Sequence, residues 1–298
     1  MKLHEVWLPF SEGAVNKHFF DHEKTKTTSA RLKNIFRALK DYSVYETSIH
    51  DAKQSARKLN RLCRIQMDER IWTMSTMMNL YHNENRIELL SSVFQKAFLS
   101  EQPPIDGISR WEDCFSDGLE LRFEVSIPSP RSYNTWLEEN SEKCQIIPYV
   151  LEAKHRMNHR EIHSTIDAVL YNPDINFAAL IEAKLLADLS VDTINDVCRN
   201  QMARNIDVML ESDDGKLNRI PERTVIMLVT PEITKMDPTS RLYGYKYIDY
   251  KNDADNIRND LPHRKDDVRL QNVGKRLGWT TWEECHRMSI KCCPWLTR

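Results

Sequence analysis

Residues 177–190, FAALIEAKLLADLS, decide the fold that we expect for this chain. The first five residues are apolar, as in a strand that is buried on both faces of a sheet. An acid, Glu182, and a base, Lys184, follow two residues apart, and strand side chains at that spacing point to one face. The segment therefore predicts a core strand that carries opposite charges close to its end.

The composition limits the classes of protein that need to be considered. Of 298 residues, 41% are hydrophobic and 29% are charged, as in a soluble globular protein with one large domain or two smaller ones. The 42 basic and 44 acidic residues nearly balance, so any surface for nucleic acid must be local. No apolar run approaches the ~18 residues of a membrane span, and the start is too short and polar for a secretory signal. We expect a cytoplasmic protein with no membrane partner.

Cysteine spacing gives little support for a metal site. The seven cysteines are scattered, and none has CxxC spacing: Cys63, Cys114, Cys144, Cys198, Cys285, Cys292 and Cys293. We expect reduced, mostly structural thiols. The segment 285–293, which contains three of them and a histidine, is the one place that leaves a zinc site open.

Helical periodicity dominates the first hundred residues, with apolar positions three and four apart in 28–45, 57–82 and 85–101. The last of these helices ends before Pro103 and Pro104, which cannot continue it easily. Residues 119–127, LELRFEVSI, have the composition of a further strand. This region predicts mainly helices, with a methionine stripe that fills the core.

The pattern then changes to strands. Three apolar runs at 145–154, 161–171 and 177–186 are separated by short loops, which predicts an antiparallel meander because parallel crossovers need about a dozen residues. A helix is expected at 191–211 and a fully buried strand at 223–232, and helix returns from 236, with a capping box at Thr281 and Glu284. We expect an α/β fold with a mixed sheet in three regions: 1–83 (helical), 84–235 (core) and 236–298 (helical).

The hairpin between the second and third runs places two acids opposite each other. A four-residue loop at 173–176 sets Asn172 opposite Phe177, and counting back sets Asp167 opposite Glu182, with Cβ atoms about 4.5–5.5 Å apart. Buried like charges repel, so a cation should compensate them. Lys184 is one candidate, and Mg²⁺ or Mn²⁺, which prefer oxygen ligands, would compensate both acids more fully.

An isolated E-x-K sequence is more often structural than catalytic. A second copy, at residues 152–154, has the character of a surface ladder. The copy at 182–184 differs because its strand is buried and because Asp167 falls into register independently.

The chain resembles the PD-(D/E)XK superfamily of restriction-endonuclease-like nucleases in the order of its expected elements, which is helix, three-strand meander, helix and strand. The resemblance also includes Asp167 on the second strand and Glu182-Ala-Lys184 on the third. The resemblance covers roughly residues 84–232, and its specificity lies in the placement of a short motif. The literal Pro173–Asp174 pair departs from the pattern, since it lies in the turn. We prefer Asp167, although Ile166 precedes it.

The resemblance implies residue roles. Asp167, Glu182 and the carbonyl of Ala183 would be metal ligands, and Lys184 would orient or deprotonate the attacking water. Glu88, on the first core helix, and Gln201, on the helix after the third strand, are the expected further catalytic residues. Arg199 and Arg204, near Gln201, are expected phosphate contacts. Independently of the resemblance, the basic loop after the first strand, KHRMNHR, offers Arg156 and Arg160 as further phosphate contacts, and a solvated turn is the alternative interpretation of that loop.

These residues predict a metal-dependent nuclease, with DNA as the expected substrate and with the helical N-terminal region serving recognition or dimerisation. A different class of function stays open, in which the chain is a catalytically inactive nuclease-fold protein that binds nucleic acid or another partner. A third alternative is a cytosolic enzyme that uses the carboxylates for other acid–base chemistry.

Overall fold

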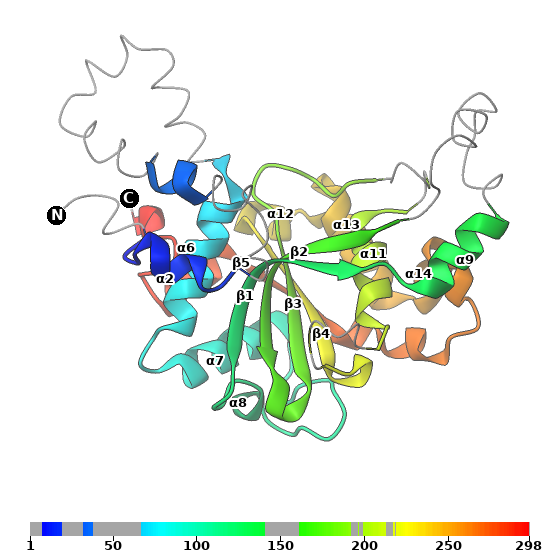
Figure 1. Cartoon of the computed structure of the whole chain (residues 1–298), viewed down its shortest axis with the longest axis horizontal. Coiled ribbons are helices and arrows are strands. Elements are labelled where there is room, and N and C mark those ends of the chain that lie inside the picture. The colour runs from blue at the N-terminus through cyan, green and yellow to red at the C-terminus, as the bar shows by residue number, and fades with distance from the viewer. Residues whose placement is uncertain are drawn as a thin grey trace, which may run out of the picture.

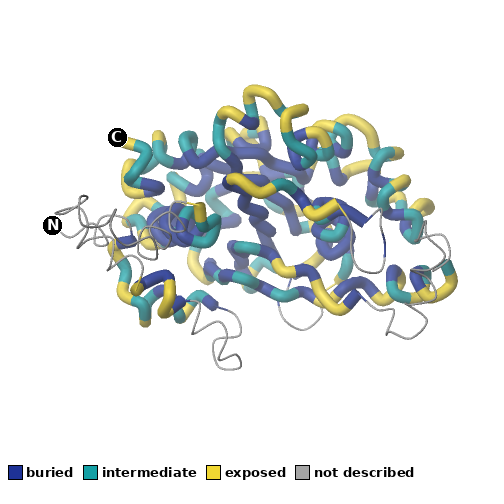
Figure 2. The backbone as a smooth tube through the Cα atoms, turned by 90° about the horizontal axis from the view of Figure 1, so that it is seen from above, coloured by how far each residue is buried: buried dark blue, intermediate teal, exposed yellow. Residues whose placement is uncertain are grey.

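A computed structural model describes residues 8–19, 32–37, 67–140, 161–191, 196, 199–212, 217 and 219–297. In these residues a five-stranded mixed sheet separates two groups of helices, which gives an α/β architecture (Figure 1). The most deeply buried segments run through the middle of the molecule (Figure 2). Within the described residues, no helix is both long and apolar enough to span a bilayer.

The strands lie in the sheet in their chain order, β1 to β5. They are β1 (Glu120–Pro128), β2 (His163–Asn172), β3 (Phe177–Ala183), β4 (Thr224–Thr230) and β5 (Leu277–Thr281). Strands β1, β2 and β3 form an antiparallel meander, and β4 and β5 add to it in parallel. Every residue of β3 and β4 is buried, which explains why their sequences are almost continuously apolar.

The sheet confirms the mixed topology and the hairpin register but differs from the expected strands in two places. The described neighbour of β2 on its outer side is β1, and the expected first strand, 145–154, lies outside the described residues. The segment 266–279 was expected to be helical, but it forms short 3₁₀ turns and then β5. Gly278 permits this strand, because a Cβ there would lie 2.4 Å from the ring of Phe98.

One group of helices covers the face of the sheet that carries Ala179, Ile181 and Ala183. This layer consists of α2 (Glu12–Asn16), α6 (Glu69–Tyr81), α7 (Arg86–Phe98), α8 (Trp111–Cys114) and α15 (Trp282–Met288). Thr281 and Glu284 form the predicted capping box at the start of α15. Because α6, α7 and α15 share one apolar cluster with the sheet, the predicted boundary at residue 83 does not interrupt the core.

The second layer packs on the opposite face, against Ala178, Leu180 and Leu228. It contains α11 (Gln201–Met209), α13 (Leu242–Asn252) and α14 (Ala254–Asp260), and α9 (Arg131–Glu139) and α12 (Glu232–Met236) lie at its margins. Of the helix expected at 191–211, the structure describes α11 from Gln201 onward, with Asn200 as its N-cap, which accepts a hydrogen bond from the Ala203 amide. Residues 192–195 and 197–198 of the expected helix lie outside the described residues.

Strands β1 and β2 both bend at the point where β3 ends (Figure 1). Glu124 has a left-handed φ of 48°, and the flanking pairs Phe123↔Ala168 and Val125↔Ile166 place it across from Asp167. Phe123 and Ala168 pack in the first apolar cluster, whereas Val125 and Ile166 pack in the second. The alternation of faces is thus broken at Asp167, so its side chain can point along the sheet toward β3.

Candidate active site

Glu182 is the centre of a buried polar group at the C-terminal end of β3. Its Oε1 accepts hydrogen bonds from Lys184 Nζ and from Gln201 Nε2, both at 2.6 Å, and its Oε2 accepts one from Asn205 Nδ2 at 2.9 Å. Gln201 and Asn205 lie four residues apart on α11, so both amides face the strand. With 3% of its surface exposed, Glu182 is fixed by these three donors.

Asp167 reaches the same strand end from β2. Its Oδ2 accepts a hydrogen bond from the Ala183 amide at 2.9 Å. The next amide, of Lys184, donates to Val229 of β4, so the N–H and C=O groups of Ala183 both face the β2 side. The carboxylate of Asp167 and the carbonyl oxygen of Ala183 therefore lie on the same side of β3, as the expected ligand set requires.

Glu69, the first residue of α6, brings a third carboxylate to this site. Its Oε2 accepts a hydrogen bond from the Leu185 amide at 2.6 Å. On the other side of the strand end, Trp282 Nε1 donates to the carbonyl oxygen of Lys184 at 3.1 Å. Helices α6 and α15 thus fix the backbone that carries the lysine.

The site contains more negative than positive charge. Burial raises the pKa of Asp167 well above its usual value, and the neighbouring Glu182 raises it further. Burial likewise raises the pKa of Glu69. Although burial opposes it, the attraction of Glu182 and Asp167 raises the pKa of Lys184, so this amine is a stable cation at neutral pH. One ammonium group therefore faces three carboxyl groups.

The oxygen donors suit a hard divalent cation such as Mg²⁺ or Mn²⁺. The described residues donate no hydrogen bond to Asp167 Oδ1 or Glu69 Oε1, so both oxygens can bind an ion. Both oxygens of Glu182 receive hydrogen bonds, so Glu182 would have to exchange one donor for the ion. In the described ranges, no three His, Cys, Asp or Glu side chains surround one common metal position.

The structure brings together four of the five expected catalytic residues: Asp167, Glu182, Lys184 and Gln201. Glu88 does not join them. It is exposed on α7, beside a surface hollow lined by Tyr81, His82 and Asp117. The glutamate that reaches the site from the first layer is instead Glu69, because α6 begins beside the end of β3 and α7 does not.

The four arginines that were expected to contact phosphate differ in their positions. Arg156 and Arg160 lie outside the described residues. Arg204 lies on α11 one turn from Gln201, is half-buried, and has a buried Nε that finds no hydrogen-bond partner among the described residues. Arg204 therefore remains a candidate for contact with a phosphate group.

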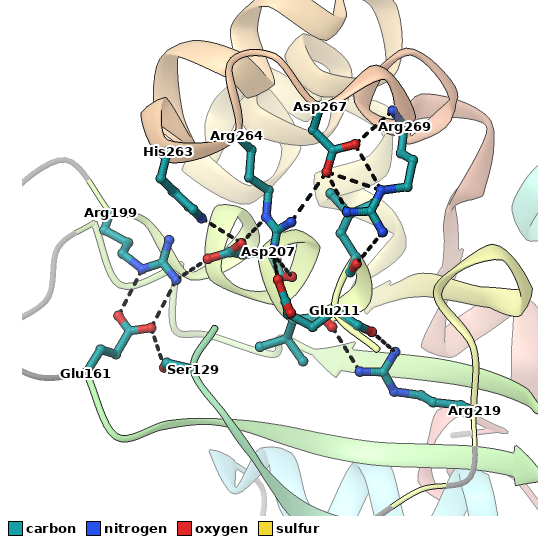
Figure 3. A network of polar contacts seen from close by, with 12 residues as sticks. Ser129, Glu161, Arg199, Asp207, Glu211, Arg219, His263, Arg264, Asp267 and Arg269 are labelled. Atoms are coloured by element: carbon teal, nitrogen blue, oxygen red, sulfur yellow. Dashed lines mark hydrogen bonds and ion pairs between the residues drawn. The ribbon is translucent and has the colours of Figure 1, made fainter. Parts of the chain in front are cut away.

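Arg199 is not available to a ligand, contrary to expectation. Its guanidinium group is 1% exposed, donates to Glu161 at 3.0 and 3.1 Å and to Asp207 at 2.7 Å, and lies 3.4 Å from the ring centroid of Tyr133 (Figure 3). Ser129 completes the contacts of Glu161 at 2.6 Å. Arg199 is thus a structural cation that joins Asp207 of α11 to Glu161, which is distant in sequence.

Sequence reasoning missed three residues of the site: Glu69, Arg70 and Asn205. Asn205 follows Gln201 by one helical turn, so the helical period alone indicates it. Asp68 is the N-cap of α6 and accepts a hydrogen bond from the Arg70 amide, so an N-cap signal marks where Glu69 lies. The hydrogen bond to Asp68 is the main reason that the pKa of Arg70 is raised, and Asp167 is close enough to add a smaller attraction.

Asp167→Asn should stabilise the metal-free protein at neutral pH. A carboxyl group whose pKa is higher in the folded protein than in the unfolded chain destabilises the fold at pH values above the pKa of the unfolded chain. Protonation removes this destabilisation as the pH falls. Asparagine keeps an oxygen for the Ala183 amide and removes the charge, so we expect the free energy of unfolding to rise by about 0.5–2 kcal/mol. Urea unfolding in EDTA at pH 7 and pH 5 measures this. A gain that does not shrink at the lower pH contradicts the prediction.

Comparisons of the chain with models of known protein families, with curated proteins and with solved structures found no significant match.

Proposed function

We propose that this protein is a metal-dependent phosphodiesterase that cleaves nucleic acid, with DNA as its substrate. The observation that supports this best is the convergence of Asp167, Glu182 and Lys184 at the end of β3, where carboxylates outnumber the one buried ammonium group. The resemblance of the motif to PD-(D/E)XK nucleases points to the same chemistry.

Asp167, the carbonyl of Ala183 and one oxygen of Glu182 would bind a Mg²⁺ or Mn²⁺ ion, and Glu69 is within reach as a further oxygen donor. When bound, the ion supplies a Lewis acid that polarises a phosphate oxygen and acidifies water. Lys184 places a fixed positive charge where negative charge develops on the phosphate. Gln201 and Asn205 keep Glu182 in place beside the lysine.

The substrate would approach past the partly exposed side chains of the site. Glu182 and Lys184 are buried, whereas Asp167, Glu69, Gln201 and Arg204 are half-buried. Arg204 lies on the same helix as Gln201 and is the expected contact for the phosphate backbone, since a guanidinium group binds the backbone without reading bases.

Supercoiled plasmid DNA and a single-stranded RNA of similar length test the proposal. Wild-type protein should cleave the plasmid with Mg²⁺ or Mn²⁺ and lose this activity in EDTA, and Asp167→Asn should be inactive. Asp174→Asn is the matched control, because Asp174 lies in the 3₁₀ turn between β2 and β3 and should not affect cleavage. Equal cleavage by all three proteins would indicate a contaminant and refute the proposal.

A binding module without activity is the alternative. It would shift DNA in a native gel without cleaving it, and Asp167→Asn would not change the shift. Metal-dependent cleavage that requires Asp167 excludes this alternative.

Arg204→Ala should weaken substrate binding without abolishing the chemistry. Loss of one phosphate contact should reduce the slope of log K against log salt by about one and weaken binding equally across sequences. Fluorescence anisotropy with a labelled duplex in Ca²⁺, at several salt concentrations, measures this. Arg258→Ala is the control, because Arg258 pairs with Asp255 on α14. An unchanged slope for Arg204→Ala would remove Arg204 from the binding surface.

A further inference from the structure

Two histidines from distant parts of the chain meet at the edge of the first helical layer. His18 follows α2, and His82 is the residue after α6. Their Nε2 atoms lie 3.1 Å apart, and the ring centroids are 5.2 Å apart with the ring planes at 74°. The rings therefore meet through nitrogen atoms and not through their faces.

A backbone carbonyl fixes the tautomer of one ring. His18 Nδ1 lies 2.9 Å from the carbonyl oxygen of Leu121 in β1. Because a carbonyl oxygen only accepts, Nδ1 of His18 carries the proton, and its Nε2 directs a lone pair toward His82. Metal-ligating histidines are commonly oriented in this way by a second hydrogen bond. The described residues give Nδ1 of His82 no partner, so its proton can occupy either nitrogen.

We infer that His18 and His82 form a binding site for a divalent transition metal that prefers imidazole, such as Zn²⁺ or Ni²⁺. Two nitrogens at about 2.0–2.1 Å from a tetrahedral ion lie about 3.3 Å apart, which a small movement of these rings provides. The ion replaces the hydrogen between the two Nε2 atoms. That proton moves to Nδ1 of His82, so binding releases no net proton at neutral pH.

The surroundings keep both rings in the neutral form that binds metals. Burial lowers the pKa of His18, and the charges of Arg122 and Lys17 lower it further. Burial, His18 and Arg86 lower the pKa of His82. Both imidazoles are therefore unprotonated at pH 7.

The nearby arginines do not prevent an ion from binding, because each is paired. Arg86 Nη2 lies 3.7 Å from Asp117 Oδ1, and Arg122 Nη2 lies 2.5 Å from Glu120 Oε2. Lys17 is exposed, so solvent screens its charge. His82 is exposed as well, which leaves room for water to complete the coordination. Among the described side chains, no third His, Cys, Asp or Glu joins the pair.

A metal at this position would join three separate segments: α2, the end of α6, and β1 through Leu121. Such an ion would bind the folded form only, so it would raise the unfolding temperature. The site is chemically distinct from the carboxylate site, because imidazole favours Zn²⁺, Cu²⁺ and Ni²⁺ whereas Mg²⁺ prefers oxygen. It does not depend on the proposed nuclease function.

Calorimetric titration with Zn²⁺ alone tests the inference, in an Asp167→Asn background so that the carboxylate site contributes less. The parent should bind one Zn²⁺ at the pair, and His18→Gln and His82→Ala should each weaken this binding roughly tenfold or more. His163→Ala is the matched control, because His163 is exposed at the start of β2. Circular dichroism verifies that each variant is folded, and His82 is exposed enough to tolerate replacement.

Cu²⁺ provides a readout that a structural defect would not mimic. Its electron paramagnetic resonance spectrum should show coupling to two imidazole nitrogens in the parent and to one in each variant. Three results would overturn the inference: no Zn²⁺ binding by the parent, binding by both variants that is as tight as that of the parent, or weaker binding in only one of the two variants. The last result would mean that the two rings share only a hydrogen bond.

Discussion

Lys184→Ala should reduce metal-dependent DNA cleavage by about 10²–10³-fold while leaving DNA affinity nearly unchanged. Lys184 is 6% exposed and donates to Glu182 at 2.6 Å, so its ammonium group is fixed before substrate arrives. A charge of this kind acts mainly on the transition state, and its loss should lower kcat more than it raises KM. Single-turnover cleavage of a labelled duplex, with anisotropy in Ca²⁺, separates the two effects.

The control for this prediction is Lys96→Ala. Lys96 lies on α7, and its Nζ contacts only the Met288 sulfur, at 4.0 Å, among the described residues. This variant should cleave like the wild type. A second variant, Lys184→Arg, keeps the positive charge but replaces the ammonium group with a larger, planar guanidinium group. It should fold, and its cleavage activity should remain reduced. If Lys184→Ala retains full activity, the lysine has no role in the reaction.

Asp207→Ala should destabilise the protein by about 3–5 kcal/mol, because it removes the buried carboxylate that Arg199 and Arg264 share and leaves their buried charge less compensated. Asp207 is fully buried on α11 and accepts hydrogen bonds from Arg199 at 2.7 Å, from His263 at 2.9 Å and from Arg264 (Figure 3). Urea unfolding monitored by tryptophan fluorescence measures the loss. Asp255→Ala is the matched control, since its exposed pair with Arg258 should contribute less than about 1 kcal/mol.

The difference between wild type and Asp207→Ala should also depend on pH. Burial opposes ionisation of Asp207, but Arg199 and His263 outweigh it and lower its pKa far below the usual value. A carboxyl group whose pKa is lowered in the folded protein contributes its full stabilisation at pH values above the pKa of the unfolded chain, about 3.9. This stabilisation is lost as the pH falls toward the pKa of the folded protein. The two unfolding curves should therefore converge below about pH 4. A constant difference down to pH 2 would show that Asp207 is not the titrating partner.

Much of the sheet could be predicted because local rules fix it. The turn at 173–176 determines the register of β2 and β3, and the pairs Asn172↔Phe177 and Leu170↔Ala179 are as counted. The register of the hairpin also brought Asp167 and Glu182 to one strand end, although the break in alternation at Asp167 was not predicted. Gln201 was expected beside them from the resemblance to PD-(D/E)XK nucleases. The inferences from the hairpin depend on residues that are close in sequence.

The rest depends on contacts between distant segments. Nothing near Arg199 shows that Glu161 will approach it, and nothing in Glu69 or Glu88 shows which helix begins beside β3. Strand β5 was missed because its segment has helix-like spacing, and only the ring of Phe98 against Gly278 shows why a strand fits there. These are properties of tertiary packing, which overrides local preference.

The position of β5 has a consequence for synthesis on the ribosome. Strand β4 pairs with β3 on one side, and its other side is completed only by β5, after residues 231–276 have been made. Until then, the growing polypeptide presents the unpaired backbone of TVIMLVT (224–230), an uncharged stretch rich in β-branched residues. Such an open edge is a template for intermolecular pairing. Recombinant expression should therefore yield more intact material when a chaperone that shields nascent strands is supplied.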